Sequence, residues 1–416
     1  MKDRERIARI RDALNESELD ALICTLPRNV LLLSGYWPVI GASVALCTRE
    51  GRVFVLAPLD EEELAKSGWA DEVRTIEPSS IEELRIVNRA VREPLRRACR
   101  DLGIDCARLG YELGGISEPV SYAAMYLYGG SLVPLLREVA PSAPLAPADE
   151  LLARLAMVKT PLEVARTGAA CRVCAQAFSN GKRWLRPGVT EVEAAARFRT
   201  PLSTWDRREF QKDGGAALRI ERADGFVWCM SGPNSAEAFR AYARSRAREI
   251  GRQEFILIHG NSYADGYWTD VTRTYVLGEP DSRQLRIYEA VLSARAAAHG
   301  VIRPGTPAAD VDRAARDELR ARGFDKEFRH ASGHGVGFDA ISPESRPRLH
   351  PKSPDVLETG MVFNVEPAIY LPGYGGMRHC DVVTVTPTGA EVMTSFHDRL
   401  EELIIRDAGS AEPKAA

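Results

Sequence analysis

The chain has 416 residues, more than one hydrophobic core usually accommodates, so two domains are expected. Its composition, 45% hydrophobic and 27% charged, is that of an ordinary globular protein. The formal net charge of −3 gives no basic surface for nucleic acid or an anionic membrane, and we expect neither as a partner.

The first residues read as a charged amphipathic helix without the apolar segment of a signal peptide. No apolar run approaches the roughly 18 residues that a membrane-spanning helix needs. The 8 cysteines are too few for a disulfide framework in so long a chain. These features predict a cytoplasmic protein with reduced thiols.

The first part of the chain alternates strand-like and helix-like segments. Residues 20–24 form a short apolar strand, residues 42–58 read as a hairpin, and residues 89–102 have helical periodicity. The alternation predicts an α/β domain with a mixed sheet over residues 1–155. The Pro- and Ala-rich segment 133–155 is interpreted as the linker that ends this domain.

One sequence motif occurs twice in the rest of the chain. LRPGVTEVEAAARF begins at Leu185 and IRPGTPAADVDRAARDEL begins at Ile302, each after a long helical pattern. In both, Pro-Gly ends one helix and a threonine (Thr190 or Thr306) is placed to cap the next. The repeat predicts a duplicated domain over residues 156–407, with two pseudo-symmetric αβ halves whose sheets join. The small, polar segment 408–416 is expected to be disordered.

A predicted hairpin with an Asp265-Gly266 turn brings a histidine and an aspartate together. A two-residue turn there places Asn261 opposite Asp270, with His259 one diagonal step away on the same face. The side chains of His259 and Asp270 could then reach one ion or one substrate atom. The alternative is structural: the histidine satisfies a strand end and Asp270 pairs with Arg273.

The segment HASGHGVGF carries His330 and His334, four residues apart and therefore on one side of a strand or helix. Its three glycines argue against a helix and predict backbone held close to another group. Imidazoles in that setting suit a metal ion or an anionic substrate group. The alternative is a Gly-rich loop with a structural histidine.

Two further candidate strands carry polar side chains. Glu366 lies inside the apolar strand VFNVEPAIY, where a carboxylate is unfavourable unless it meets a cation. In the strand MRHCDVVTV, Arg378 and Cys380 share one face, and His379 and Asp381 share the other. Taken alone, Cys380 reads as a small buried hydrophobic side chain.

The order of these motifs resembles the pita-bread family of prolidases, aminopeptidase P, methionine aminopeptidases and creatinase. The resemblance rests on DVTRTY, HASGHGVG, GMVFNVEPAIY and GGMRxxD in this order, and PRNVLLLSGY and SGPNSA are similar to the prolidase–creatinase branch. It implies an α/β (α+β) fold with a creatinase-like N-terminal α/β domain and a pseudo-symmetric pita-bread domain. It also implies a homodimer. Tyr36-Trp37, at an expected loop tip, is a candidate contact, the alternative being a local core position.

The peptidases that this chain resembles hold two divalent metals with two aspartates, a histidine and two glutamates. Asp270, His334 and Glu366 match the second aspartate, the histidine and the first glutamate of that set. His259 stands where the first aspartate is expected, and Cys380 stands where the last glutamate is expected. Because a carboxylate can bridge two ions and an imidazole cannot, these departures predict one divalent metal, zinc or iron in preference to paired manganese or cobalt.

Two accessory histidines usual in these peptidases are also replaced, one by Phe239 and one near Ile341, whereas His330 matches a retained histidine. We therefore predict a hydrolase of a C–N bond in a small polar or dipeptide-like substrate, with water bound to the metal as nucleophile. His330 and Arg378 are expected to orient the substrate, and His259 is a fourth ligand or a base. Five side chains are candidate ligands of the metal: His259, Asp270, His334, Glu366 and Cys380.

Three alternatives remain open at the level of the sequence. The first is an Xaa-Pro aminopeptidase or dipeptidase with two metals. The second is a metal-free amidine hydrolase similar to creatinase or ectoine hydrolase. The third is a binding module that has lost catalysis.

Overall fold

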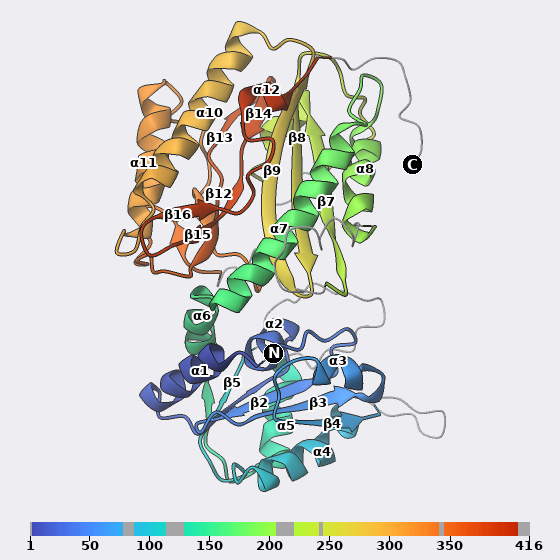
Figure 1. Ribbon diagram of the computed structural model, residues 1–416, viewed down its shortest axis with the longest axis vertical. Helices are drawn as coiled ribbons and strands as arrows, with labels where there is room; N and C mark the ends of the chain where they lie inside the picture. The colour runs from blue at the N-terminus through green and yellow to red at the C-terminus, as the bar shows by residue number, and fades with distance from the viewer. Residues whose placement is uncertain are drawn as a thin grey trace. The chain divides into compact units, whose positions relative to one another are not determined.

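The computed structural model (Figure 1) forms two compact units, Met1–Ala156 and Met157–Ala416. Both units are of the predicted α/β class. The described residues are 2–77, 87–113, 129–204, 220–240, 244–340 and 345–406. The tail 408–416 and the position near Ile341 lie outside them.

The N-terminal unit is built on a six-stranded mixed sheet in the order β4-β3-β2-β1-β5-β6. The predicted hairpin is β2 and β3, which pair antiparallel, and the predicted apolar strand is β1. All three are buried along their whole length, which explains why they read as apolar runs without alternation. The strands are β1 (Ala21–Cys24), β2 (Val44–Thr48), β3 (Val53–Pro58), β4 (Glu72–Ile76), β5 (Leu109–Tyr111) and β6 (Leu145–Pro147).

The interpretation of residues 133–155 as a linker is wrong. Most of this segment is helical, and Leu135 and Leu136 lie in the core of the unit. Its prolines fall partly on β6, an edge strand, where a missing N–H is tolerated. The helices of the unit are α1 (Arg4–Glu16), α2 (Pro27–Ser34), the 3-10 turn η1 (Leu59–Glu61), α3 (Glu62–Lys66), α4 (Val87–Asp101), α5 (Gly129–Val139) and α6 (Asp149–Met157).

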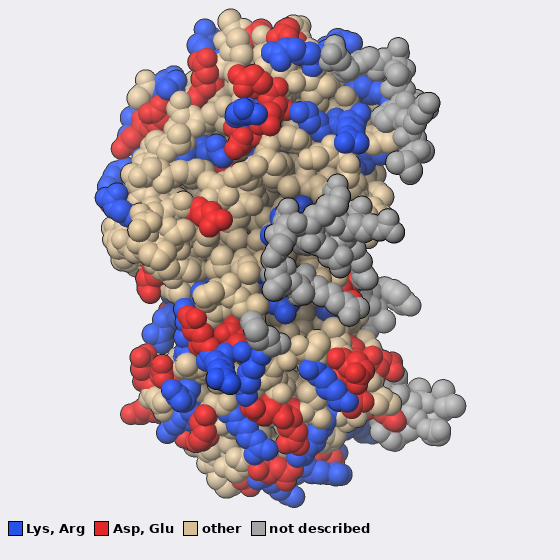
Figure 2. All heavy atoms as spheres, viewed as in Figure 1, with Lys and Arg blue, Asp and Glu red and all other residues tan. Residues whose placement is uncertain are grey.

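The pair Tyr36-Trp37 is not at an exposed loop tip. Tyr36 is 1% exposed and Trp37 is 6% exposed. The hydroxyl of Tyr36 donates a hydrogen bond to Glu61 over 2.7 Å. The pair therefore belongs to the core of its own unit, and its proposed role as a contact with a second subunit is wrong. On the face shown in Figure 2, acidic and basic side chains intermingle over the N-terminal unit.

The C-terminal unit repeats one arrangement, a pair of packed helices followed by strands. The first pair is α7 and α8, and the second is α10 and α11. Thr190 caps α8 in a capping box with Glu193, as predicted. Thr306 does not cap α11, because the N-cap is Pro307 and the threonine hydroxyl donates to the carbonyl oxygen of Val301. The helices are α7 (Pro161–Lys182), α8 (Glu191–Ser203), the 3-10 turn η2 (Gly232–Glu237), α10 (Ser282–Val301), α11 (Ala308–Ala321) and α12 (Leu400–Leu403).

Among the described residues of the C-terminal unit, the strands form one four-stranded sheet, β17-β9-β8-β7, and three smaller sheets. A bridge between Thr272 and Cys380 joins the first half to the second. The strands are β7 (Ala223–Ser231), β8 (Phe255–Ala264), β9 (Tyr267–Leu277), β10 (Gly333–His334), β11 (Arg348–Leu349), β12 (Val362–Val365), β13 (Ala368–Leu371), β14 (Gly375–Arg378), β15 (Asp381–Val385), β16 (Ala390–Val392) and β17 (Ile404–Ile405).

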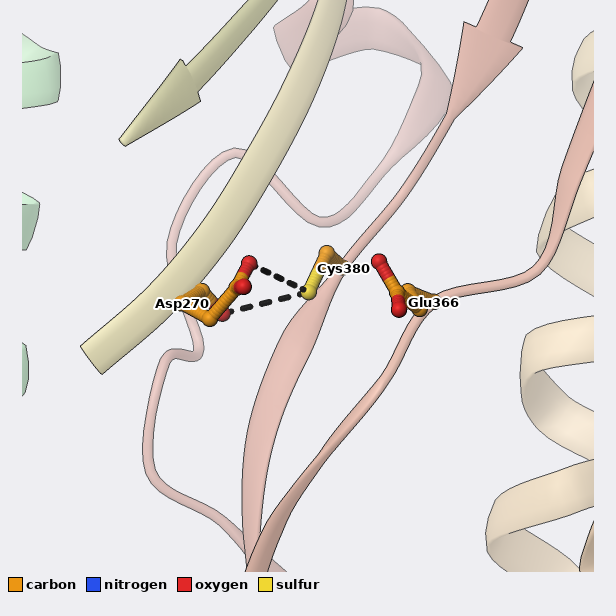
Figure 3. Close-up of side chains that lie close together, drawn as sticks. All are labelled: Asp270, Glu366 and Cys380. Atoms are coloured by element: carbon orange, nitrogen blue, oxygen red, sulfur yellow. Dashed lines mark hydrogen bonds between the residues drawn. The ribbon is translucent and has the colours of Figure 1, made fainter. Parts of the chain in front are cut away.

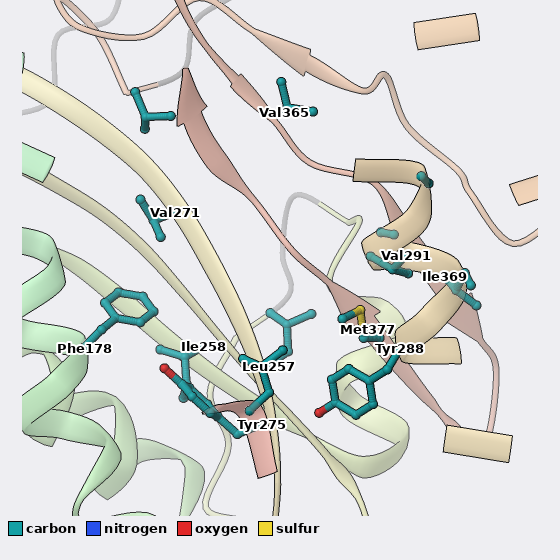
Figure 4. Close-up of a cluster of buried hydrophobic side chains, with 14 of the residues drawn as sticks. Phe178, Leu257, Ile258, Val271, Tyr275, Tyr288, Val291, Val365, Ile369 and Met377 are labelled. Carbon is teal, nitrogen blue, oxygen red and sulfur yellow. The ribbon is translucent and has the colours of Figure 1, made fainter. Parts of the chain in front are cut away.

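The core of this unit lies on both faces of the β8–β9 hairpin (Figure 4). Ile258 lies on the side of Phe178 from α7, whereas its neighbour Leu257 lies on the side of Met377 and Tyr288. Burial on both faces explains the unbroken apolar run at the start of β8. Within the described part of the chain, no helix is both long and apolar enough to cross a membrane.

Candidate active site

The β8–β9 hairpin has the register expected from its turn. Asn261 pairs with Asp270, and His259 pairs with Thr272. The turn residues Asp265-Gly266 both have positive φ, 48° and 84°, which is typical of a type I′ hairpin. The Nδ1 atom of His259 lies 3.7 Å from an oxygen of Asp270, which is 3% exposed. The hairpin therefore holds these two side chains together on one face.

The glycines around His334 allow the close backbone approach that the sequence predicted. A Cβ atom on Gly333 would lie 1.9 Å from the carbonyl oxygen of Asn364, and one on Gly335 would lie 2.0 Å from another carbonyl oxygen. The Nε2 atom of His334 lies 3.5 Å from an oxygen of Asp270. Its Nδ1 lies 3.0 Å from the carbonyl oxygen of Gly335, which can only accept, so Nδ1 carries the hydrogen. The lone pair of the neutral ring is then on Nε2, beside Asp270.

Glu366 does not lie within one continuous strand, as the sequence predicted. The strand breaks at Glu366-Pro367, between β12 and β13. A proline cannot donate to a strand ladder, which accounts for the break. Glu366 is 8% exposed and turns toward Asp270 and Cys380 (Figure 3). Each of the three offers one donor atom, and these atoms lie within 4.8 Å of one another.

Arg378 places a positive charge beside this cluster. Its Nη1 lies 3.6 Å from an oxygen of Glu366, and its Nε donates to the hydroxyl of Thr272 over 2.9 Å. On the opposite face, as predicted, Asp381 accepts a hydrogen bond from Arg273 over 2.8 Å. Arg273 therefore pairs with Asp381 and not with Asp270, which contradicts that part of the structural alternative for the hairpin.

Both ring nitrogens of His330 have protein partners. Its Nδ1 lies 2.7 Å from the carbonyl oxygen of Ala331, and its Nε2 lies 2.9 Å from the hydroxyl of Tyr370. The carbonyl can only accept, so Nδ1 donates and Nε2 accepts from the tyrosine. Burial, with the charge of Arg378, lowers the pKa of His330 to about 3. The ring is thus neutral and fixed in its plane.

Burial sets the charge of the remaining groups. It lowers the pKa of His259 to about 4, with Asp270 opposing the shift and Arg378 adding to it. It raises the pKa of Glu366 and, with the charges of Asp270 and Glu366, raises that of the Cys380 thiol well above its usual range. Burial also opposes ionisation of Asp270, but His259, His334 and Arg378 outweigh it and lower the pKa of that carboxyl. Without a bound cation, Cys380 is therefore a thiol.

A cavity of about 480 Å³ opens onto these groups. Six of the seven predicted site residues line it, and the seventh, Cys380, contacts Asp270. Sequence reasoning did not select several other wall residues: Trp228, Met230, Phe239, Arg240, Asn261, Arg244 and Arg348. Asn261 could have been found, because it shares the face of His259 at a spacing of two. Arg240 and Arg244 lie four residues apart after η2, whereas Arg348 lies on β11, so sequence spacing does not connect the first two to the third.

Two family models match this chain. The model of metallopeptidase family M24 matches residues 165–387, and that of the creatinase/prolidase N-terminal domain matches residues 6–158. The probable dipeptidase PepE of Mycobacterium tuberculosis is 34% identical over 259 residues, which are 62% of this chain and 63% of PepE. This chain thus spans just under two thirds of the length of PepE.

Two other proteins are similar over almost the whole chain. The Xaa-Pro dipeptidase of Pyrococcus furiosus is 27% identical over 397 residues, which are 95% of this chain and 99% of the relative. The structure of an Xaa-Pro dipeptidase from Bacillus anthracis has a TM-score of 0.75 at 25% identity and covers 96% of this chain and 99% of its own. These matches confirm the two-domain prediction of a creatinase-like N-terminal domain and a pita-bread domain. The chain belongs to metallopeptidase family M24.

Proposed function

We propose that this protein hydrolyses a C–N bond of a dipeptide-sized substrate in the 480 Å³ cavity, with one divalent metal ion bound beside it. Membership of family M24 implies divalent metal binding. One observation carries the proposal. The donor atoms of Asp270, Glu366 and Cys380 lie within 4.8 Å of one another at this cavity, as ligands of a single ion would.

The chemistry of the donor set fits one ion better than two. With Nε2 of His334 beside Asp270, the set comprises two carboxylates, an imidazole and a sulfur that would bind the ion as a thiolate. Zinc and ferrous iron accept such a mixed set, whereas a pair of hard cations requires more oxygen donors. A bound ion would supply Lewis acidity that polarises the scissile carbonyl group.

The chain's own residues would hold the substrate in place. Arg378 is anchored by Thr272 and lies beside Glu366, so its charge is fixed in position toward the cavity. His330 would act as a fixed wall and not as a base, because Tyr370 and Ala331 use both of its nitrogens. Both residues thus retain the proposed role of orienting the substrate.

A second candidate is an Xaa-Pro dipeptidase with two metals. Relatives that match 95–96% of this chain carry the name Xaa-Pro dipeptidase, which favours this candidate. Against it stand His259 and Cys380 at positions where two hard cations would require carboxylates. Phe239 lines the cavity without an acid–base group.

Metal analysis and a dipeptide panel distinguish the two candidates. We expect about one zinc or iron per subunit, and loss of both metal and hydrolysis in His334→Ala. Two manganese or cobalt ions, with turnover of Xaa-Pro dipeptides on the order of 1–10³ per second, would establish the second candidate. A metal-free protein whose hydrolysis survives His334→Ala would contradict both and support the metal-free amidine hydrolase.

We also propose a homodimer, on the basis of the resemblance to the pita-bread family. Sedimentation velocity at micromolar concentration should give a mass near twice the 45.8 kDa of the chain. A monomer under these conditions would contradict the proposal.

A further inference from the structure

The hydroxyl of Thr272 joins Arg378 to His259. Its Oγ1 accepts from Nε of Arg378 over 2.9 Å and lies 3.0 Å from Nδ1 of His259. Thr272 is fully buried, and among the described residues its hydroxyl has these two partners only. A guanidinium cannot accept a hydrogen bond. The hydroxyl hydrogen therefore has one acceptor, Nδ1 of His259.

This contact determines which nitrogen of His259 carries hydrogen. A neutral imidazole that accepts at Nδ1 has its hydrogen on Nε2, and a protonated ring has one there as well. In either state, Nε2 is a hydrogen-bond donor without a lone pair for a metal. The ring also stacks on Trp228, with centroids 5.5 Å apart and planes 17° apart, which holds its orientation at the cavity wall.

Asn261 offers a second donor on the same face of β8. Its side chain lines the cavity and is 6% exposed, and its Nδ2 has no hydrogen-bond partner within the described part of the chain. Asn261 lies two residues from His259 on the same face of β8, so the two side chains are neighbours at the cavity wall. A buried N–H group without an acceptor is unfavourable, and it points to an acceptor brought by a ligand.

We propose that His259 and Asn261 form a subsite that binds an acceptor oxygen of the substrate, an amide carbonyl or a carboxylate, and that His259 is not a metal ligand. The inference rests on the proposed function only for the identity of the substrate. Two N–H donors fixed beside a cavity stabilise negative charge on an oxygen without reorganisation. The β8 strand thus contributes substrate binding, while β9 contributes the metal ligand Asp270.

The tautomer of His259 is the first test. Long-range ¹H–¹⁵N spectra of histidine-labelled protein, with His259→Phe to assign the signal, should show hydrogen on Nε2. Thr272→Val should release Nδ1 and change this pattern. Thr269→Val, a buried threonine of β9 that bonds Ser262, should leave it unchanged. Hydrogen on Nδ1 alone in the natural protein would overturn the proposal.

Ligand and metal binding provide the second test. N-acetyl-L-proline and N-acetylpyrrolidine share an amide carbonyl, and only the first has a carboxylate. Calorimetry should show binding of N-acetyl-L-proline weakened about tenfold in His259→Phe and in Asn261→Leu, but not in Ser262→Ala. If binding of N-acetylpyrrolidine weakens equally in these variants, the subsite binds the amide carbonyl oxygen. If binding of N-acetylpyrrolidine does not weaken, the subsite binds the carboxylate. Unchanged binding in both variants, or no binding of either probe to the natural protein, would overturn the proposal.

Zinc affinity is measured in His259→Phe and in His334→Ala. His259→Phe should keep its zinc affinity within about twofold of the natural protein, whereas the zinc affinity of His334→Ala should fall more than tenfold. Equal losses in the two variants would make His259 a ligand and contradict the inference. Absence of zinc binding in the natural protein would instead contradict the proposed function, while the tautomer and the probe affinities would still test the subsite.

Discussion

The thiol of Cys380 donates a hydrogen bond to the main-chain carbonyl oxygen of Asp270 over 3.1 Å. The same sulfur lies 3.5 Å from Oδ1 of Asp270. A thiol can make these contacts because it has a hydrogen to donate, whereas a carboxylate at the same position would face two acceptors and require a cation between them. A thiol can therefore occupy, without a cation, the position where the family resemblance implies a glutamate.

Restoring carboxylates should restore a second ion. In the double variant His259→Asp, Cys380→Glu, the stoichiometry should rise from about one metal per subunit to about two, with manganese gaining most because the donors become harder. Plasma mass spectrometry of dialysed protein provides the measurement, with each single variant as a control. Two metals in the natural protein would contradict the single-ion site.

The glycine before His334 should be essential for its position. Gly333→Ala would place a Cβ atom 1.9 Å from the carbonyl oxygen of Asn364, which is part of the backbone and cannot give way cheaply. We expect a loss of about 1–3 kcal/mol in the free energy of unfolding, together with weaker zinc binding. Gly300→Ala is a matched control, because a Cβ atom added to this glycine of α10 would meet no neighbouring atom within 4 Å. This variant should leave the free energy of unfolding unchanged or raise it slightly. Equal stability of the two variants would contradict the close approach.

The buried pair of Arg273 and Asp381 should be a major support of the C-terminal unit. Both side chains are 0% exposed, so removing one partner leaves an uncompensated buried charge. Asp381→Asn should cost about 3–5 kcal/mol in urea unfolding. Arg313→Ala breaks an exposed pair with Asp310 and should change stability by less than about 1 kcal/mol. A similar effect of both variants would show that the buried pair does not hold the strands.

The same carboxylate gives a pH dependence of known sign. Although burial alone would raise the pKa of Asp381, the charges of Arg273, His379 and Arg295 lower it well below the usual range. The group is thus ionised in the folded protein, and its stabilisation is present above the unfolded pKa of about 3.9 and is lost as the pH falls below that value. The free energy of unfolding of the natural protein should therefore fall below about pH 4 more steeply than that of Asp381→Asn. Parallel curves would contradict this assignment.

The sequence predicted the parts of the site that depend on strand periodicity. The Asp265-Gly266 turn determined the register that pairs Asn261 with Asp270. The predicted single strand MRHCDVVTV is wrong, because it divides into β14 and β15, but Cys380 and Asp381 still lie on opposite sides, as alternation predicted. Such predictions succeed because a side-chain period of two is a local property of the backbone.

The sequence could not predict contacts that depend on elements distant in the chain. The hydroxyl of Tyr370 occupies the ring of His330, and Thr272 determines the tautomer of His259 through its bond to Arg378. The bond between Thr272 and Arg378 arises only when the two halves dock, and that between His330 and Tyr370 joins segments 40 residues apart, so no local spacing records either contact. The prediction of a linker over residues 133–155 was wrong for a different reason. It relied on the Pro and Ala content and did not weigh the leucines that pack into the core.

The bridge between Thr272 and Cys380 joins two halves that each hold only part of the proposed ligand set. Asp270 belongs to the first half, and His334, Glu366 and Cys380 belong to the second. During synthesis on the ribosome, a nascent chain that ends before residue 380 cannot assemble the set. With this proposed set, loading with an ion is a late step that follows synthesis of residue 380, and a product truncated before it would lack the sulfur ligand.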